Sequence, residues 1–476
     1  MKRVLIKALA LVFSFILALS CCVIGFAEEE TNMTAEKADS WNQLFDRSGK
    51  TNSWLCADGI YSVSLDGRDA IGSATDKTKS FFIFSDTFIG NADTNGVMNS
   101  QGMVNHSAML LEGDQPLDDS AEFIWGLRAD TSKKSNMFGA DLWMFDLLCD
   151  GKNLYLFGFT HDNQWKPGRI DMYTVPVTED GVDLTAFKRK PLVSQLLKKT
   201  EKKHYVFSMG IMPNTKTAGV KNPDGYYYFY GYRDNIDYAF FQTKDLIVSR
   251  IHEKDFPDFS KLTYWNGSEW GTNIEESAVI VENVSCEVSV TPIDYGPNAG
   301  KYIAVYTEAV QSSHMRYALG ETPWGPFSES VEFYTAPETQ TTALGNNGTL
   351  YTYNAKAHPH LSDSNRLLIS YNVNVSGSAA LNCKDYHPRF LYLDLGGEVP
   401  EVMPEDTTTD TVVGSTSAPI VDTPVTDTPI SSSGTLTPEP AVPKQSPALP
   451  IALSVGAALL LGGGIGLLWY FKKKRK

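Results

Sequence analysis

Short runs of aromatic and aliphatic residues, each preceded by polar turn residues, recur along the chain at a nearly constant spacing. Five such runs begin at residues 81, 154, 226, 302 and 367, so that neighbouring runs start 65 to 76 residues apart. Self-similarity at a fixed period is typical of repeated supersecondary units that bury one another's faces. A period of this length, built from strands, fits one blade of a β-propeller per repeat.

Each repeat holds three strand-like runs, of which the aromatic or aliphatic run described above is the second. Turn residues such as Asp-Gly and Asn-Pro-Asp-Gly separate the first run from the second. The earlier runs are residues 60–65, 143–148, 206–212, 288–293 and 355–361. The later runs are residues 103–111, 170–177, 238–243, 315–319 and 389–395. Helical periodicity is scarce, and residues 192–199 are the best short candidate for a helix. The pattern predicts an all-β fold, a five-bladed β-propeller over residues 40–397, although a long β-sandwich or a β-helix would also show short strands with turns.

Residues 1–27 read as a secretory signal peptide. A basic start is followed by an apolar stretch and by a small-x-small cleavage site at residues 25–27. Cys21 and Cys22 raise the alternative of lipid attachment, but the residues before them fit a lipobox poorly. We therefore expect an ordinary cleaved signal.

The C-terminal part of the chain predicts a membrane anchor. Residues 398–450 are rich in Thr, Ser and Pro and contain no aromatic residue, which predicts a disordered stalk. Residues 451–471 carry no charge and are long enough to cross a bilayer as a single transmembrane helix. The basic tail at residues 472–476 then lies in the cytoplasm, so the propeller is expected outside the cell, anchored to the cell membrane.

The net charge limits the kinds of partner that the chain can bind, and the cysteines bear on possible disulfides. The formal net charge is −15, and it becomes −23 without the three basic residues of the signal and the five of the tail. An acidic exterior repels phosphate backbones, so we expect no nucleic-acid partner. The mature chain keeps Cys56, Cys149, Cys286 and Cys383, which allow one or two disulfides but fit buried thiols equally well.

In a hairpin, the start of the first strand and the end of the second lie side by side, so these ends of all five blades should share one face. Asp58 and Asp86 fall at such ends of one hairpin, close enough to perturb each other's pKa. Glycoside cleavage needs two carboxyl groups, one as acid and one as base or nucleophile, on opposite sides of the scissile bond. Asp141 and Glu287, each at the start of an inner strand, are candidates for the second side. The structural alternative for each is a carboxylate that caps a turn or pairs with Arg.

Other polar and aromatic residues at the same strand ends are candidates for substrate binding. They are Asn105, His106, Trp143, Arg233, Glu308, His358 and His360. Asn105 and His106 fit a sugar-contacting or a structural role equally well, and Trp143 could stack on a sugar face. His358 and His360 alternate as metal ligands can, but without a third ligand they fit a polar site or a buried channel better. We expect neither a metal nor a cofactor.

Several segments resemble known families. Residues 57–63 and 84–88 resemble the first blade of secreted bacterial domains in domain-of-unknown-function families 4185 and 5005, and residues 353–360 and 368–372 look like their last blade. Residues 322–327 (Thr-Pro-Trp-Gly-Pro-Phe) are similar to the blade-ending turn of five-bladed glycoside hydrolases of the arabinanase and invertase kind. The resemblance spans roughly residues 54–395. It implies a five-bladed propeller and, for part of the group, hydrolysis of arabinofuranose-containing polymers.

The resemblance also implies that the first three blades each supply one acidic residue. Asp58 matches the first position and Asp141 is a candidate for the second, but residues 206–210 offer no carboxylate for the third, and Glu287 is a substitute. The sequence thus predicts a membrane-anchored extracellular protein that acts on polysaccharide, most simply as a glycoside hydrolase. The alternative is a non-catalytic glycan-binding or adhesion module. A sialidase is a further alternative, but its S-x-D-x-G-x-T-W repeats are missing.

Overall fold

A computed structural model describes most of the expected propeller. The described residues are 33–126, 137–139, 142–161, 167–191, 193–235, 242–340, 348–363, 365–376 and 382–397. The expected signal peptide, stalk, transmembrane helix and basic tail lie outside these ranges, as does Asp141. Within the described ranges, no helix is both long and apolar enough to cross a bilayer.

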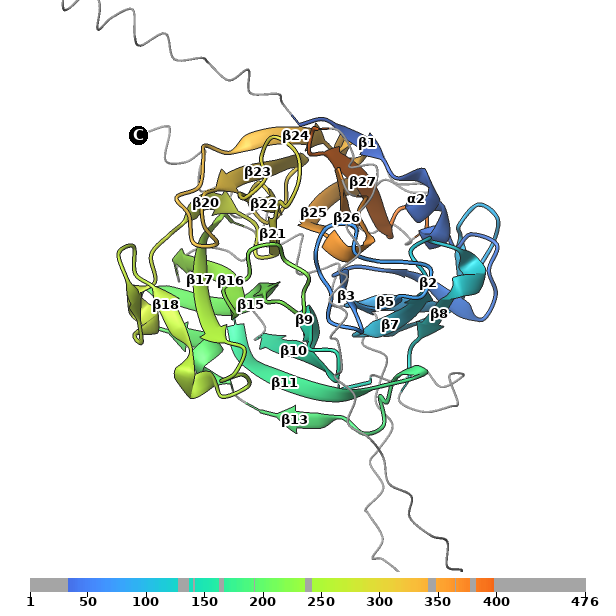
Figure 1. Ribbon diagram of the computed structural model, residues 1–476. Coiled ribbons are helices and arrows are strands. Elements are labelled where there is room, and N and C mark those ends of the chain that lie inside the picture. The colour runs from blue at the N-terminus through green and yellow to red at the C-terminus, as the bar shows by residue number, and fades with distance from the viewer. Residues whose placement is uncertain are drawn as a thin grey trace, which may run out of the picture. The chain divides into compact units, whose positions relative to one another are not determined.

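Five antiparallel sheets surround a common centre, as in a β-propeller (Figure 1). The first strand of each sheet lies innermost and contacts the first strand of the next sheet, from blade 1 through to blade 5. Blade 5 returns to blade 1 through a hydrogen bond of 2.7 Å between His358 Nδ1 and Ser62 Oγ. The ring is therefore closed by contacts between residues almost 300 positions apart in the sequence.

Blades 1 and 2 come from the N-terminal half of the ring. Blade 1 contains β3 (Tyr61–Ser64), β4 (Lys79–Phe84), β7 (Ser107–Glu112) and β8 (Ala121–Ile124). Blade 2 contains β9 (Trp143–Cys149), β10 (Asn153–His161), β11 (Pro167–Thr178) and β13 (Lys188–Lys190), with β12 (Gly181–Val182) added to β11.

Blade 3 is the largest sheet because three short strands are added to its basic four. The basic strands are β15 (Lys203–Asn214), β16 (Tyr226–Asn235), β17 (Lys244–His252) and β20 (Val281–Val284). The additions are β14 (Leu197–Lys199), β18 (Thr263–Trp265) and β19 (Trp270–Gly271). Blade 4 contains β21 (Val288–Pro292), β22 (Tyr302–Thr307), β23 (His314–Gly320) and β24 (Val331–Thr335).

Blade 5 joins the two ends of the described chain. It contains β25 (Thr349–Ala357), β26 (Arg366–Ser376) and β27 (Pro388–Asp394), and its outer strand is the N-terminal β1 (Ala35–Lys37), which pairs with β27. The folded unit therefore begins a few residues before the expected start at residue 40. The following helix α2 (Asp39–Phe45) packs on β27, where Phe45 and Trp41 stack on Phe390 with ring centroids 5.1 and 5.5 Å apart.

A separate three-stranded sheet is built from segments that flank the strands of blade 1. It contains β2 (Ser53–Ala57), β5 (Thr87–Ala92) and β6 (Met98–Val104). Six short 3₁₀ turns complete the described elements: Asp118–Ser120, Ser194–Leu196, Phe259–Lys261, Ile274–Glu276, Pro337–Gln340 and Pro359–Leu361. The small sheet matters for function because Asp58 follows β2 and Asp86 precedes β5.

The hydrophobic core lies between neighbouring blades rather than at one central point. One cluster joins blades 1 and 2 around Phe81 and Leu156, another joins blades 2 and 3 around Phe157 and Phe229, and a third lies between blade 5, α2 and blade 1. The central strands of each blade are buried on both faces, which explains why the sequence shows continuous apolar runs there instead of alternation.

Three expected elements differ in the structure. Of the expected helix at residues 192–199, the described residues 193–199 are not an α-helix: a 3₁₀ turn leads into β14, which pairs with β15 and so is held in an extended conformation. The third described strand of blade 3 is Lys244–His252, whereas residues 238–241 of the expected run 238–243 lie outside the described residues. In blade 5 the first strand ends at Ala357, and residues 359–361 form a 3₁₀ turn instead of continuing the expected strand.

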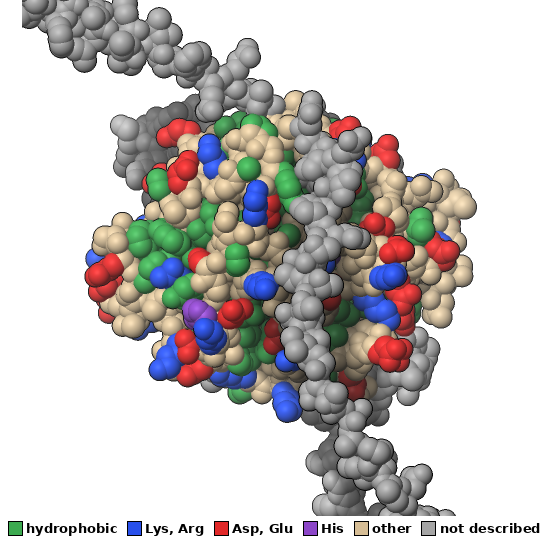
Figure 2. Space-filling model, in the orientation of Figure 1, with side chains coloured by type: hydrophobic (Ala, Val, Ile, Leu, Met, Phe, Trp, Pro, Cys, Tyr) green, Lys and Arg blue, Asp and Glu red, His purple; other side chains and the backbone are tan. Residues whose placement is uncertain are grey.

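The turn at residues 322–327 contributes to an aromatic cluster at the edge of blades 3 and 4. Trp324 from this turn packs near Trp265 and Trp270 of the β18–β19 hairpin, with ring centroids 5.8 and 5.4 Å away. The Arg250 guanidinium lies 4.0 Å from the Trp270 ring and 4.1 Å from the Tyr226 ring. In Figure 2, hydrophobic side chains gather on the surface over β17 and β18, while acidic and basic side chains are interspersed elsewhere. Cation–π stacking thus fastens the added hairpin to blade 3.

Gly210 marks a close approach of two inner strands. A Cβ atom on Gly210 of β15 would overlap the carbonyl oxygen of Val288 of β21. We expect Gly210→Ala to lower the free energy of unfolding by about 3 kcal/mol, because blades 3 and 4 must move apart to admit the methyl group. Denaturant unfolding measures this effect. The control is Gly271→Ala, where the nearest atom to the added Cβ is 4.0 Å away. Equal losses in both variants would contradict the expectation.

Candidate functional site

Asp58 and Asp86 lie together where the small sheet meets blade 1. The backbone amide of Ser85 donates a hydrogen bond of 2.8 Å to the carbonyl oxygen of Asp58, which joins the two carboxylate-bearing segments. Gly59 permits this approach: its φ is +58°, and a Cβ there would lie 2.7 Å from Ser85 Oγ. The expected hairpin pair is therefore present, and the backbone brings it together.

Three side chains hold this pair, and two of them come from a distant part of the chain. The Tyr353 hydroxyl of β25 donates a hydrogen bond of 2.7 Å to Asp58 Oδ2. The Tyr386 hydroxyl donates 2.8 Å to the carbonyl oxygen of Asp86, and Asn105 Nδ2 lies 3.4 Å from Asp86 Oδ1. Asn374 Nδ2 in turn donates to the Tyr353 hydroxyl at 3.2 Å. Asn105 was expected from the sequence, whereas Tyr353, Tyr386 and Asn374 were not.

The environment raises the pKa of both carboxyl groups. Burial is the largest cause that raises the pKa of Asp58 to about 7, and the negative charges of Asp86 and Glu287 add to it, against the hydrogen bonds from Tyr353 and Tyr386. Burial likewise raises the pKa of Asp86 to about 6, against the Asn105 hydrogen bond and the charge of His161. With these pKa values, both carboxyl groups exchange protons closer to neutral pH than a solvated aspartate does.

Glu287 lies near this pair and forms an ion pair with Lys356. The Lys356 Nζ atom of β25 contacts Glu287 Oε2, and both side chains are buried. Glu287 is close enough for its charge to act on Asp58. The structure therefore groups three of the four expected carboxylates, Asp58, Asp86 and Glu287, and the fourth, Asp141, lies outside the described residues.

Trp143 and His161 lie beside this group on blade 2. Their rings are 4.3 Å apart, and the His161 charge acts on Asp86. Two expected binding residues are engaged in ion pairs on their own blades: Arg233 lies 3.6 Å from Asp245 in blade 3, and Glu308 lies 2.6 Å from Arg316 in blade 4. Trp143 is half-buried at the start of β9.

The three expected histidines, His106, His358 and His360, are buried inside the fold. His106 is fully buried, and its Nε2 accepts a hydrogen bond of 2.8 Å from the amide of Phe138. Burial lowers the pKa of His106 to about 4, so the ring is neutral. His358 lies between Ser62 and Ser370, and His360 Nε2 lies 3.1 Å from Ser80 Oγ at the start of β4.

The structure corrects the expected position of His358 and His360, which were placed on the same face of the propeller as the carboxylates. Because β25 ends at Ala357, both residues follow the strand instead of beginning it, and they lie at the turn end of the blades. They contribute packing and ring closure between blades 5 and 1. Their position is a consequence of the strand boundary, which the sequence pattern placed too late.

At the third acidic position implied by the family resemblance, β15 contains a bulge. The register between β15 and β16 shifts between Phe207 and Gly210, and Ser208 has a φ of +73°. Ser208 is fully buried, and its hydroxyl has no hydrogen-bond partner among the described residues. The bulge thus places Ser208 at this point of blade 3, and its side chain is not a carboxylate.

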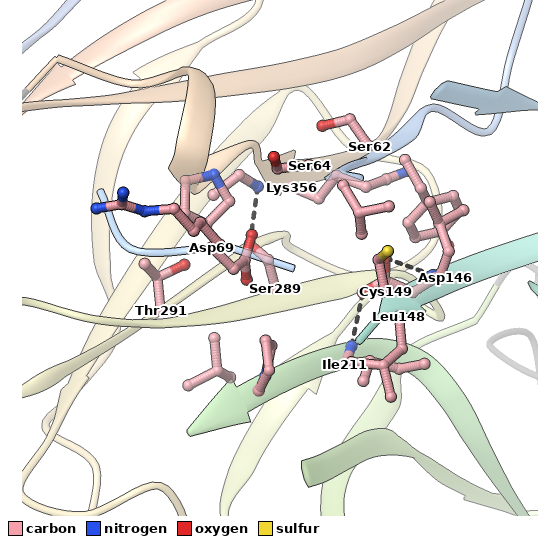
Figure 3. A pocket seen from close by; sticks show the side chains of 18 of the residues that line it. Ser62, Ser64, Asp69, Asp146, Leu148, Cys149, Ile211, Ser289, Thr291 and Lys356 are labelled. Atoms are coloured by element: carbon pink, nitrogen blue, oxygen red, sulfur yellow. Dashed lines mark hydrogen bonds between the residues drawn. The ribbon is translucent and has the colours of Figure 1, made fainter. Parts of the chain in front are cut away.

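A small central cavity of about 30 Å³ lies between the inner strands of all five blades (Figure 3). Its polar lining includes Ser62, Asp69, Asp146, Ser289 and Lys356. Asp146 accepts hydrogen bonds from the amides of Ile211 at 2.6 Å and Leu147 at 2.9 Å, and burial raises its pKa to about 8.

In the described part of the chain, no cluster of three or more His, Cys, Asp or Glu side chains is placed to hold a metal ion. Cys56, Cys149, Cys286 and Cys383 are buried free thiols.

The closed ring of five blades defines the described part of the chain as a β-propeller domain. Residues 38–394 match the family model described as domain of unknown function 5005, and the chain belongs to this family. No curated protein matches the chain.

Several solved structures are similar to the chain, and one of them shares its fold. A protein from Bacteroides ovatus, provisionally described as a hydrolase, is 16% identical, with 77% of this chain and 92% of that chain covered and a TM-score of 0.55. A thermostable family-43 glycoside hydrolase is 13% identical, with 73% and 90% covered and a TM-score of 0.37. An α-L-arabinofuranosidase from Podospora anserina in complex with cellotriose is 12% identical, with 73% and 98% covered and a TM-score of 0.32. At these identities the first structure shows a common fold, and the other two add no weight to it.

The raised pKa values make the stability of the protein depend on pH in a defined direction. The folded-state pKa values of Asp58 and Asp86 lie above the unfolded value of about 4, so the folded protein binds protons more tightly than the unfolded chain. The contribution of these two carboxyl groups to the free energy of unfolding therefore falls as the pH rises from about 4 to 7. We expect Asp58→Asn to raise the free energy of unfolding by about 1–3 kcal/mol at pH 8 and to have little effect at pH 4.

Denaturant unfolding at several pH values measures this difference. Asp76→Asn, an identical change at an exposed turn of the same blade, serves as the control and should show no such trend. An Asp58→Asn protein that is less stable than the wild type at pH 8 would contradict the assignment.

Proposed function

We propose that this chain is a glycoside hydrolase in which Asp58 and Asp86 share the proton used for bond cleavage. The observation that carries the proposal is the pair itself: two neighbouring carboxyl groups with pKa values raised to about 7 and 6, at the strand ends of a propeller blade. Carboxyl groups tuned to neutral pH are suited to general acid–base catalysis. The shared fold with a protein described as a hydrolase supports the same class.

In the proposed reaction, the Asp58–Asp86 pair donates its proton to the glycosidic oxygen as the bond from that oxygen to the anomeric carbon breaks. The carboxylate of Glu287 serves the opposite side, where its negative charge stabilises positive charge at the anomeric carbon. Water adds its oxygen to the anomeric carbon, and the proton that it loses returns to the Asp58–Asp86 pair. The products are two hydroxyl groups, and the enzyme regains its starting state.

The proposed substrate class is a polysaccharide with furanoside linkages, such as arabinan. The family resemblance at the first blade, the last blade and the turn at residues 322–327 supports this class. The half-buried ring of Trp143 beside His161 provides an apolar surface on which a sugar face can stack.

A screen for sugar release from plant and cell-wall polysaccharides tests the proposal. We expect wild-type protein to release sugar from at least one polymer, and Asp58→Asn and Asp86→Asn to lower kcat by at least about 100-fold, because each removes an acid–base group. Asp76→Asn should retain full activity. If the wild type binds glycans but releases no sugar, and both substitutions leave binding unchanged, the alternative of a non-catalytic glycan-binding or adhesion module is favoured.

We also propose that the domain is extracellular and anchored to the cell membrane by residues 451–471. The support is the uncharged stretch of membrane-spanning length, the basic tail that follows it, and the signal-like pattern of residues 1–27. Expression of the full chain and of a chain truncated after Pro450, followed by separation of membranes, tests this. The full chain should sediment with membranes and be digested by protease added to intact cells, while the truncated chain should be released. Recovery of the full chain in the soluble fraction would contradict the proposal.

A further inference from the structure

Lys356 and Glu287 form an ion pair deep inside the ring. The side-chain exposure is 2% for Lys356 and 8% for Glu287. The Lys356 Nζ atom also lies 4.0 Å from the centroid of the Tyr61 ring. Side chains from blades 5, 4 and 1 therefore meet at this one ammonium group.

The backbone of β25 is shaped to deliver this lysine. The register with β26 shifts between Tyr353 and Lys356, and Asn354 within this bulge has a left-handed φ of +60°. A bulge re-aims the side chains that follow it. Before the bulge, Tyr353 donates its hydrogen bond to Asp58, and after it, Lys356 reaches Glu287. The single strand β25 thus contacts two carboxylates of the candidate site, Asp58 and Glu287.

Stability is a weak explanation for this arrangement. Two charges lose their hydration when they are buried, and their mutual attraction often only repays that cost. Removing one partner, in contrast, leaves an unpaired buried charge, which a carboxylate relieves by binding a proton. The charge state of Glu287 is therefore tied to the presence of Lys356.

The groups that face these carboxylates come from several blades. Glu287 faces Lys356, Tyr61 and Cys286. Asp58 faces Asp86, Glu287, Tyr353, Tyr351, Tyr386 and Cys56. Asp86 faces Asn105 and His161, and the lysine ammonium also acts on Asp146 and His358. Among these neighbours, Lys356 is the cation in direct contact with Glu287.

We propose that Lys356 is a positioning residue that holds Glu287 as a buried anion, so that proton exchange is left to Asp58 and Asp86. The inference rests on the proposed function for the roles of the three carboxylates. It adds a residue that the sequence pattern did not single out. Without Lys356, Glu287 would bind a proton and its negative charge would no longer act on Asp58.

Removing the lysine should therefore have the same effect on Asp58 as removing the glutamate charge. We expect Lys356→Met and Glu287→Gln each to lower the titration midpoint of the Asp58–Asp86 pair by on the order of one pH unit, and the double variant to lower it no further. Lys356→Arg keeps the positive charge and should keep the wild-type midpoint. Carboxyl-detected NMR of the full chain with ¹³C-labelled aspartate measures this, with the Asp58 signal identified by its loss in Asp58→Asn.

The proposal is overturned if Glu287→Gln lowers the midpoint and Lys356→Met leaves it unchanged or raises it. Should Lys356→Met be too unstable to study, Lys356→Gln removes the charge while keeping a hydrogen-bond donor, and the same expectation applies. This titration needs no substrate, so it decides the role of Lys356 even if no polysaccharide is cleaved.

Once a substrate is known, kinetics adds a second readout. If Lys356 acts through Glu287, Lys356→Met should lower kcat at least 10-fold with KM within about twofold, and it should have little further effect in the Glu287→Gln background. Equal losses in both backgrounds would show that Lys356 acts independently of Glu287, and would contradict the proposal.

Discussion

Closure of the ring between blade 5 and blade 1 is the constraint on which the candidate site depends. Asp58 stands at the start of the ring, and the hydroxyl that contacts it belongs to Tyr353, 295 positions later. The strand β1 pairs with β27, and His358 bridges to Ser62, so the two ends of the described chain are fixed to each other. The cost of ordering so long a loop is met by the apolar surfaces buried between blades. Without closure, Asp58 would keep Asp86 but lose Tyr353, Tyr386 and Glu287.

The same closure creates the electrostatics of the site. Burial is the largest cause of the raised pKa values of Asp58 and Asp86, and burial here requires blades 1 and 5 and the small sheet to meet. Burying charged carboxylates at the site lowers the stability of the fold, because the buried groups are poorly hydrated. Hydrogen bonds from Tyr353, Tyr386 and Asn105 reduce this loss of stability. Such a local conflict with stability is typical of functional sites, because the groups are arranged for chemistry and not for packing.

The strands and the hairpin pair could be predicted from the sequence because their signals are local. The apolar runs mark the buried middle strands, and Asp58 and Asp86 follow from the ends of a single hairpin. Tyr353, Tyr386 and Lys356 could not be predicted in the same way, because their roles depend on how blade 5 approaches blades 1 and 4. The alternation of Tyr351 and Tyr353 was a usable local signal for β25. His358 and His360 were misplaced because the bulge and early end of β25 disrupt the periodicity on which the strand boundary was judged.

The titration of Asp58 and Asp86 in the wild-type protein tests the central claim most directly. If ring closure buries the two carboxyl groups side by side, ¹³C carboxyl signals should show that the pair retains a proton until the pH reaches about 6 to 7. If both carboxyl groups instead lose their protons near pH 4, like solvated aspartates, the shared proton and the site built on it are contradicted.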